Sequence, residues 1–398
     1  MKSPAVLTVL FALCTMLGPL GIDTYLPSFQ AIGQEFSASP ATVQQTLSAY
    51  VIAMGATMLF YGTLSDTFGR RRVMIFSGAG YCITSLVAAF APSIESLIVM
   101  RFMQGLTAGS GMVIMRAMVQ DRYQGAEAQR KMAFVMMIFG VAPALAPIFG
   151  GWLQTHGGWR ASFYFLSAFG ALLALLCWRV LPETLAPDKR VPLKLGVISA
   201  NYLRALSNRR FRTMLLGLGL MAGASSVYIS SAAEFVVTVL RKDVTSFAWL
   251  FIPLIGGTMV GSAISGTFAK RLSMRTQKKI GYGCLVLACA SNLLYNSLTA
   301  QPEVPWAVLP IAIYTLGISL LMPILTIETM GQFPEMRGLA SSLQGFTQMA
   351  VFSLISSLLV PHLFHSGLLL AVGQSVVVAT GMLVWWWATR RTGTAAKA

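Results

Sequence analysis

Long apolar runs alternate with short polar or charged segments along the whole chain. Between Ser3 and Ile22, for example, no side chain is charged at neutral pH. An apolar run of about 20 residues has the length that an α-helix needs to cross the hydrocarbon core of a membrane. Cutting the sequence at its charged and turn-rich clusters predicts twelve membrane-spanning helices, near residues 4–27, 43–65, 73–91, 96–120, 132–154, 160–181, 211–237, 245–269, 279–300, 304–330, 338–361 and 366–389.

The longest connection divides these helices into two sets of six. It predicts an N-terminal half at 1–181, a cytoplasmic central loop at 182–210 and a C-terminal half at 211–398. A short internal echo supports the division, because GTLSD at 62–66 ends the second span and GTFAK at 266–270 ends the eighth. Many transporters build a midplane site from paired repeats. The pattern therefore predicts an all-α polytopic membrane protein with two pseudo-symmetric six-helix halves.

Basic residues are concentrated on one side of the predicted membrane. Hydrophobic residues make up 56% of the chain and charged residues only 11%, too little charge for the surface of a soluble protein. If the N-terminus is cytoplasmic, most of the 29 Lys and Arg residues lie on that side, and Arg160, Arg241 and Lys242 lie opposite. This bias follows the positive-inside rule and predicts that both termini are cytoplasmic. Loops that face anionic lipid then explain the net charge of +16 without a nucleic-acid partner.

No constellation in the sequence indicates catalysis or a bound cofactor. The five cysteines fall in apolar spans, with neither a disulfide framework nor a zinc-binding spacing, and the three histidines lie in separate short connections. The phosphate-binding pattern G-x-x-x-x-G-K-[ST] is absent from the sequence. We therefore expect neither enzymatic activity nor a metal or other cofactor.

Two charged residues lie within predicted spans near the same membrane surface. Asp23 is toward the outer end of the first span, and Arg101 is about one turn into the fourth. A charge at the centre of a membrane helix costs about 2.5–3.5 kcal/mol, so such residues usually face a cavity or a partner. One interpretation makes Asp23 a titratable group in a water-accessible cavity with Arg101 as its partner. The alternative is that Asp23 marks the interface and Arg101 makes structural hydrogen bonds.

Polar side chains in other spans indicate a candidate cavity lining. Glu234 lies toward the outer end of the seventh span, within SSVYISSAAEF, and is a second candidate acid for proton coupling. The serines before it either line a cavity or bond back to their own helix. Glutamines in the eleventh span either line the cavity too or form hydrogen bonds between helices. The candidate lining residues are Tyr25, Gln104, Tyr228, Ser231, Gln344 and Gln348.

Small residues form ridges on two of the predicted helices. The fifth span contains GVAPALAPIFGG at 140–151, in which two prolines each remove a backbone donor and small residues recur at i+4 spacing. Gly257, Gly261 and Ser265 form a similar ridge on the eighth span. Such ridges permit close helix approach. We expect these two helices to meet across the halves.

Three motifs, in order, resemble those of a known family. They are YGTLSDTFGRRRV at 61–73, RFMQGLTAG at 101–109 and the GVAPALAPIFGG segment at 140–151. Together with GIDTYLP at 21–27, they make the chain resemble the major facilitator superfamily. Within that superfamily, the chain is most similar to the Bcr/CflA group of drug:proton antiporters.

The resemblance implies roles for individual residues. Asp23 would be the membrane-embedded acid and Arg101 its proton-relay partner, with Glu234 as a departure from the family pattern. A cytoplasmic latch, in which glycine permits a tight turn and opposite charges join helix ends, would consist of Gly62, Asp66, Gly69, Arg70 and Asp121. An antiporter motif on the fifth helix would consist of Gly140, Pro143, Pro147, Gly150 and Gly151.

The expected function is export of small amphiphilic, drug-like molecules in exchange for protons. The protein would act as a monomer in the bacterial inner membrane, powered by the proton gradient alone. The alternative is an exporter of a cellular metabolite, such as an amino acid or nucleoside, for which drug efflux is incidental. Comparing drug resistance with metabolite excretion in an expressing strain separates the two.

Overall fold

A computed structural model describes residues 4–123, 125–190, 195–243, 246–268, 273–299, 301–333 and 336–390. Throughout these ranges the regular structure is helical and contains no strand. The chain divides into two compact units, Met1–Lys194 and Leu195–Ala398. The predicted all-α fold is therefore confirmed for the described part of the chain.

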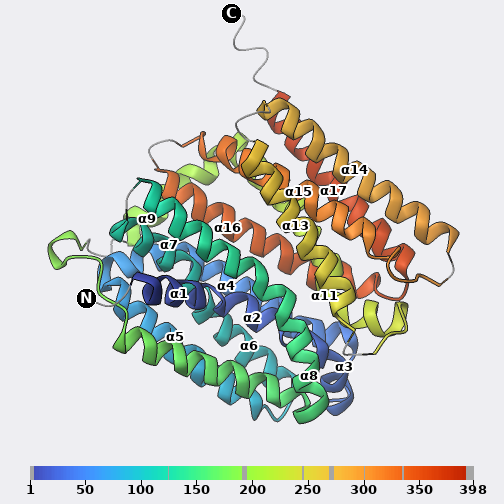
Figure 1. Ribbon diagram of the computed structural model, residues 1–398, viewed down its shortest axis with the longest axis horizontal. Coiled ribbons are helices and arrows are strands. Elements are labelled where there is room, and N and C mark those ends of the chain that lie inside the picture. The colour runs from blue at the N-terminus through green and yellow to red at the C-terminus, as the bar shows by residue number, and fades with distance from the viewer. Residues whose placement is uncertain are drawn as a thin grey trace, which may run out of the picture. The chain divides into compact units, whose positions relative to one another are not determined.

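Helices of the first unit pack in long side-by-side pairs, notably α5 with α8 and α4 with α6 (Figure 1). Two of them begin at sequence-encoded caps: the Ser39 hydroxyl accepts from the Thr42 N–H before α4, and Ser93 and Ser96 form a capping box before α6. The helices are α1 (Pro4–Thr15), α2 (Leu17–Asp23), α3 (Phe29–Glu35), α4 (Pro40–Phe68), α5 (Arg70–Ala89), α6 (Ile94–Ala108), α7 (Ser110–Arg122) and α8 (Gly125–Arg179).

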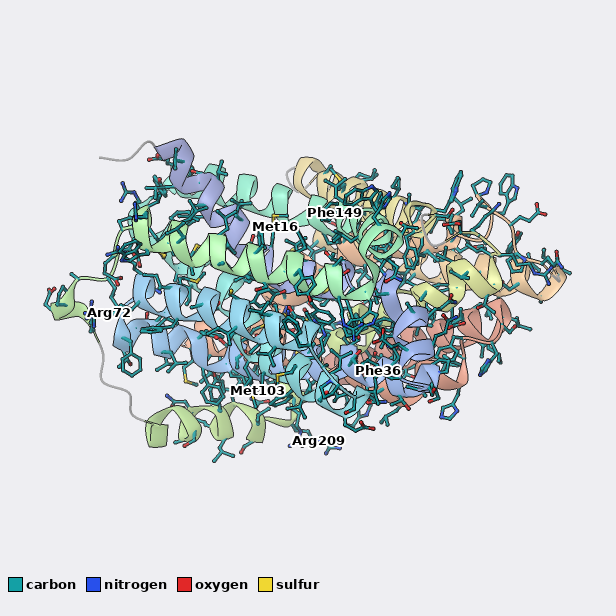
Figure 2. All side chains as sticks on the ribbon, turned by 90° about the horizontal axis from the view of Figure 1, so that it is seen from below. Met16, Phe36, Arg72, Met103, Phe149 and Arg209 are labelled. Carbon is teal, nitrogen blue, oxygen red and sulfur yellow. The ribbon has the colours of Figure 1, made fainter. Side chains whose placement is uncertain are left out.

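The first predicted span is broken, although the apolar pattern predicted one helix at 4–27. The axis bends by 45° at Met16, which Figure 2 labels, and a 3₁₀ turn at Leu26–Ser28 separates α2 from α3. A proline lacks an N–H and its ring clashes with the carbonyl four residues earlier. Helix α1 ends four residues before Pro19, and α2 ends four residues before Pro27. The two prolines thus account for both breaks.

Helix α8 contains two predicted spans, 132–154 and 160–181. Its helical path continues past Pro143 and Pro147, and the chain changes direction at Gly158, which has φ 69° and ψ −178°. Only glycine occupies this region of backbone space without strain. Gly158 therefore permits the turn between the fifth and sixth spans.

In the second unit, α13 and α14 pack against α15, and α10 packs against α16 and α17. Its seventh span is interrupted near Ser225 and Ser231 and continues into a π-helical turn at Phe235–Val239. The helices are α9 (Leu195–Ser207), α10 (Arg209–Gly223), α11 (Ser226–Ser230), α12 (Ala232–Glu234), α13 (Ala248–Phe268), α14 (Met274–Leu298), α15 (Leu309–Met330), α16 (Arg337–Leu354) and α17 (Gly367–Arg390). Helix α9 lies within the segment 182–210 that was predicted as a loop.

Among the described residues, eight helices are long and apolar enough to cross a membrane, and the bent first helix adds a ninth. The broken seventh span and α14 correspond to two more of the twelve predicted spans.

Three glycines of the predicted small-residue ridges contact segments of their own unit closely. A Cβ atom on Gly257 would lie 2.1 Å from the Ala312 carbonyl oxygen, and one on Gly261 would lie 2.5 Å from that of Leu316. Both carbonyls belong to α15 in the same unit. On α8, Gly150 packs against Thr24 of the first unit. These contacts all lie within one unit, and the expectation that the two ridges meet across the halves stays a prediction.

Candidate functional site

A completely buried arginine is the centre of the candidate site in the first unit. Arg101, on α6, has no solvent-exposed surface. Its guanidinium carbon lies 4.6 Å from the Tyr25 ring centroid and 4.1 Å from that of Tyr50. Arginine stays protonated in proteins, so this charge needs compensating dipoles when it is removed from water. The faces of the two aromatic rings supply part of that compensation.

Hydrogen bonds supply the rest. Nη2 of Arg101 donates to the Gly21 carbonyl over 2.7 Å, and Nη1 donates to the side-chain oxygen of Gln104. Gln104 in turn donates to the Ser85 hydroxyl at 2.6 Å. The Arg101 Nε has no hydrogen-bond partner among the described residues. Arg101 therefore joins α6 to the backbone of the broken first helix.

Other side chains reach the same broken helix. The Tyr50 hydroxyl, from α4, donates to the carbonyls of Leu17 and Gly18 at 3.2 and 3.0 Å. Tyr25 shares a 2.7 Å hydrogen bond with Thr46, also on α4. The interruptions in the first helix thus coincide with a layer of buried polar contacts that the sequence pattern did not reveal.

Asp23 is the last residue of α2 and is only 5% exposed. Within the described ranges its carboxylate makes no hydrogen bond or ion pair. The predicted pairing with Arg101 is not formed, because the arginine's donors are directed to Gly21 and Gln104 and its faces to aromatic rings. The structure therefore brings Asp23 and Arg101 to the same stretch of the first helix and leaves the acid unpaired.

The motif glycine of α8 contacts the residue that follows Asp23. A Cβ atom on Gly150 would lie 2.1 Å from the Thr24 carbonyl oxygen, and the Ser162 hydroxyl donates to that same oxygen at 3.4 Å. Gly150 thus permits α8 to approach the break in the first helix. Pro143, Pro147 and Gly151 lie on the same helix, and the surroundings of Gly140 fall outside the described residues.

Four of the five predicted latch residues lie together. Arg70 Nε is 2.5 Å from an Asp121 carboxylate oxygen, and Arg70 Nη2 is 3.3 Å from an oxygen of Asp66. Gly69, with φ 95°, forms the turn between α4 and α5. Gly62 is different: it lies inside α4, and no atom is within 4 Å of where its Cβ would be. The tight turn expected of a latch glycine is therefore made by Gly69, and the helix continues through Gly62.

Sequence reasoning missed a further acid in this cluster. Glu183, just after α8, accepts hydrogen bonds from the backbone N–H groups of Arg70 and Arg71 at 3.0 and 3.3 Å. A carboxylate is favoured at the first turn of a helix, where the N–H groups are free. Its only signal in the sequence is that it is one of two acids in a mostly basic connection.

The candidate residues of the second unit are mostly uncharged. Glu234 is half-buried and accepts from the Thr238 hydroxyl at 2.7 Å, within the π-helical turn. Ser231 donates back to the Val227 carbonyl, as the alternative interpretation of these serines predicted. Gln344 donates to Thr326 at 2.8 Å, and Nε2 of Gln348 has no partner in the described part of the chain.

Tyr228 belongs to a buried network that was not predicted. The side-chain amide of Asn292, on α14, donates to the Tyr228 hydroxyl at 2.8 Å and to Gln374 of α17 at 3.3 Å. Asn292 and Gln374 lie in apolar runs of two different helices. Their contact depends on how these helices pack, which the spacing of residues in the sequence does not specify. Among the described residues, this network contains no carboxylate and no basic side chain.

The sequence profile of the Major Facilitator Superfamily matches residues 11–357. The chain belongs to this superfamily. It is 26% identical to the bicyclomycin resistance protein homolog of Haemophilus influenzae, with 98% of each chain covered. It is 28% identical to multidrug resistance protein D of Escherichia coli, with 88% of each chain covered. The expected resemblance to Bcr/CflA-type transporters is thereby confirmed.

Solved structures of this superfamily share the fold. The D-xylose-proton symporter superposes with a TM-score of 0.73, over 98% of this chain and 99% of the symporter, at 14% sequence identity. At that identity the likeness shows the fold alone. Among the described residues, no group of three or more His, Cys, Asp or Glu side chains is placed to hold a metal ion.

Proposed function

We propose that this chain is a proton-coupled antiporter that exports small drug-like molecules across the bacterial inner membrane. The observation that carries the proposal is the unpaired, buried Asp23 at a break in the first helix, beside the buried Arg101. The names of the similar proteins from Haemophilus influenzae and Escherichia coli support drug-like molecules as the substrate.

The role proposed for Asp23 follows from its setting. A carboxylate in a mostly dry site can hold a proton or face a cationic group, and each state changes the charge balance around it. Arg101 is held by two aromatic rings and by the carbonyl of Gly21, two residues before Asp23, so it provides a fixed positive charge on the stretch of the first helix that carries the titrating acid. Binding of the substrate and binding of the proton are then alternatives at one place, as exchange requires.

The latch gives this exchange a conformational consequence. Arg70 joins the start of α5 to Asp121 near the end of α7, and opposite charges can bridge these helix ends in only one arrangement. We assign this end of the unit to the cytoplasmic side, with both termini, on the basis of the basic residues in its connections. Opening and closing at this end would alternate access to the site.

The proton gradient is sufficient as an energy source. A single charge moving through 100 mV supplies about 2.3 kcal/mol. That free energy supports a roughly 50-fold gradient of a neutral substrate, at 1.4 kcal/mol per tenfold ratio. The proposal therefore requires neither a nucleotide nor a metal cofactor, and one chain contains all of the proposed machinery.

Replacement of Asp23 by Asn tests the proposal. The amide cannot release a proton, so we expect Asp23→Asn to abolish protection of an efflux-deficient strain against growth-inhibiting amphiphilic compounds, at unchanged membrane abundance. The matched control is Asp188→Asn, because Asp188 is exposed in the connection after α8. Full protection by Asp23→Asn would contradict the coupling role. Failure of the unmodified chain to protect against any such compound, with excretion of a metabolite instead, would contradict drug export.

A further inference from the structure

A second carboxylate cluster lies at the end of the first unit opposite the latch. Glu35, the last residue of α3, accepts a bidentate pair of hydrogen bonds from Arg160 at 2.6 and 3.0 Å. The indole N–H of Trp159 donates to the same carboxylate at 2.6 Å. We call Glu35, Trp159 and Arg160 the Glu35 cluster. In Figure 2, Phe36, which follows Glu35, and Arg72 of α5 lie at opposite ends of this unit.

Both donors of the cluster come directly after the glycine turn of α8. Gly158 adopts φ 69° and ψ −178°, and Trp159 and Arg160 begin the helical segment that follows. Trp159 is 3% exposed and its ring packs 5.7 Å from that of Phe36. The backbone conformation that only glycine tolerates thus places two hydrogen-bond donors against the end of α3.

The same helix also contacts the chain just after Asp23. Gly150 and Ser162 of α8 meet the Thr24 carbonyl, and the Phe163 ring packs 5.2 Å from the Tyr25 ring. Helix α8 therefore contacts both ends of the segment from Thr24 to Glu35. This segment contains the 3₁₀ turn and α3, so it behaves as a short rigid element between its two contacts.

We propose that Glu35 is a positioning residue for Asp23. The Glu35 cluster fixes α3 to α8 and so holds the break at Thr24 in place. The Asp23 carboxylate then keeps its position relative to the Gly21 carbonyl, which binds Arg101. Release of the cluster lets α3 move and changes where the titrating group lies. The inference rests on the proposed coupling role of Asp23.

The geometry distinguishes this cluster from an ordinary surface ion pair. The Glu35 and Arg160 side chains are 40% and 39% exposed, and an isolated pair at that exposure contributes little. Here three donors share one carboxylate, two of them in the fork geometry that makes arginine–carboxylate contacts strong and specific. The third donor belongs to a buried indole.

Hydrogen exchange in the purified full-length protein tests the structural part of the inference. We expect Glu35→Gln to speed exchange of the α3 amides, Phe29–Glu35, several-fold, and to leave α5 unchanged. Arg160→Gln should have a similar effect, and the double variant should add little to either, because both remove the same contact. The matched control is Glu303→Gln, since Glu303 is exposed before α15 and its carboxylate has no partner among the described residues. Unchanged α3 exchange, or additive effects, would overturn the proposal.

The pH dependence of transport tests the positioning role. We expect the pH profile of proton-driven efflux to move by about half a unit in Glu35→Gln, the size of shift that a contact of this strength can cause. Reduced abundance with an unmoved profile would show a structural role only and would overturn the inference. Asp23→Asn separates the two proposals: if it retains transport, the coupling role fails, whereas loss in Asp23→Asn with an unmoved profile in Glu35→Gln contradicts only the role of Glu35.

Discussion

At the residue scale, Arg101 illustrates why the type of basic side chain matters more to the site than its charge alone. Its planar guanidinium stacks on Tyr25 and Tyr50 and donates in two directions, to Gly21 and Gln104. A lysine has one compact ammonium group and cannot reproduce stacking and a forked set of hydrogen bonds together. The charge would remain, but its position relative to Asp23 would not be fixed.

We therefore expect Arg101→Lys to impair transport although it keeps the positive charge. Loss of one hydrogen bond to a charged group is worth about 1.5–3 kcal/mol, which corresponds to roughly a tenfold to hundredfold change in an equilibrium or rate. Initial rates of efflux in membrane vesicles, normalised to protein abundance, measure the effect. Rates equal to those of the unmodified chain would show that charge alone is sufficient.

Single residues are also where prediction from sequence was weakest. Asp23 and Arg101 were identifiable because charges in apolar runs are costly. The partners of Arg101 were not identifiable, nor was the lack of a partner for the Asp23 carboxylate among the described residues. Arg101 binds a backbone carbonyl 80 positions earlier in the chain, and a carbonyl has no sequence signature. Glu183 and the Asn292–Gln374 contact were missed for the same reason, since each depends on helices that are distant in sequence.

At the element scale, the broken first helix determines the site. A hydrophobic run predicted this element as one continuous span, and the run does mark its position correctly. Its breaks are local effects of Pro19 and Pro27, which apolar periodicity does not register. The breaks are stabilised by close contact with α8 at Gly150, so the element depends on a neighbour more than 100 residues away.

This dependence predicts the effect of filling the contact. We expect Gly150→Ala to destabilise the protein by about 1–3 kcal/mol, the usual cost of overpacking, because its Cβ would lie 2.1 Å from the Thr24 carbonyl oxygen. The matched control is Gly256→Ala on α13, where no atom lies within 4 Å of the added Cβ. Thermal unfolding in detergent compares the two variants. Equal stability of Gly150→Ala and the unmodified chain would mean that α8 does not constrain the break.

At the scale of the whole molecule, the two halves use similar contacts with different chemistry. The fourth span of the first unit presents Arg101 to the Gly21 carbonyl, and the fourth span of the second presents Tyr314 to the Met221 carbonyl at 2.6 Å. The neutral hydroxyl does not supply a fixed positive charge, as the guanidinium of Arg101 does. This difference supports the assignment of proton coupling to the first half.

The overall architecture was the part most accessible from sequence. The fold was predicted from twelve apolar runs and the connection at the midpoint of the chain. Such runs are long and continuous because membrane helices must satisfy their backbone groups internally. The superfamily was predicted from the motifs near residues 61–73 and 101–109. The helix at Leu195–Ser207 was missed, since it is too short to produce such a long apolar run.

The measurement that most directly tests proton coupling through Asp23 is proton flux across energised inside-out vesicles that contain the full-length chain. A compound against which the chain protects cells is added while a dye reports the pH of the lumen. We predict that the compound raises the lumenal pH as protons leave in exchange for it, and that Asp23→Asn vesicles show no such change. Uptake of the compound without any proton movement, or equal proton movement in Asp23→Asn vesicles, would contradict the account.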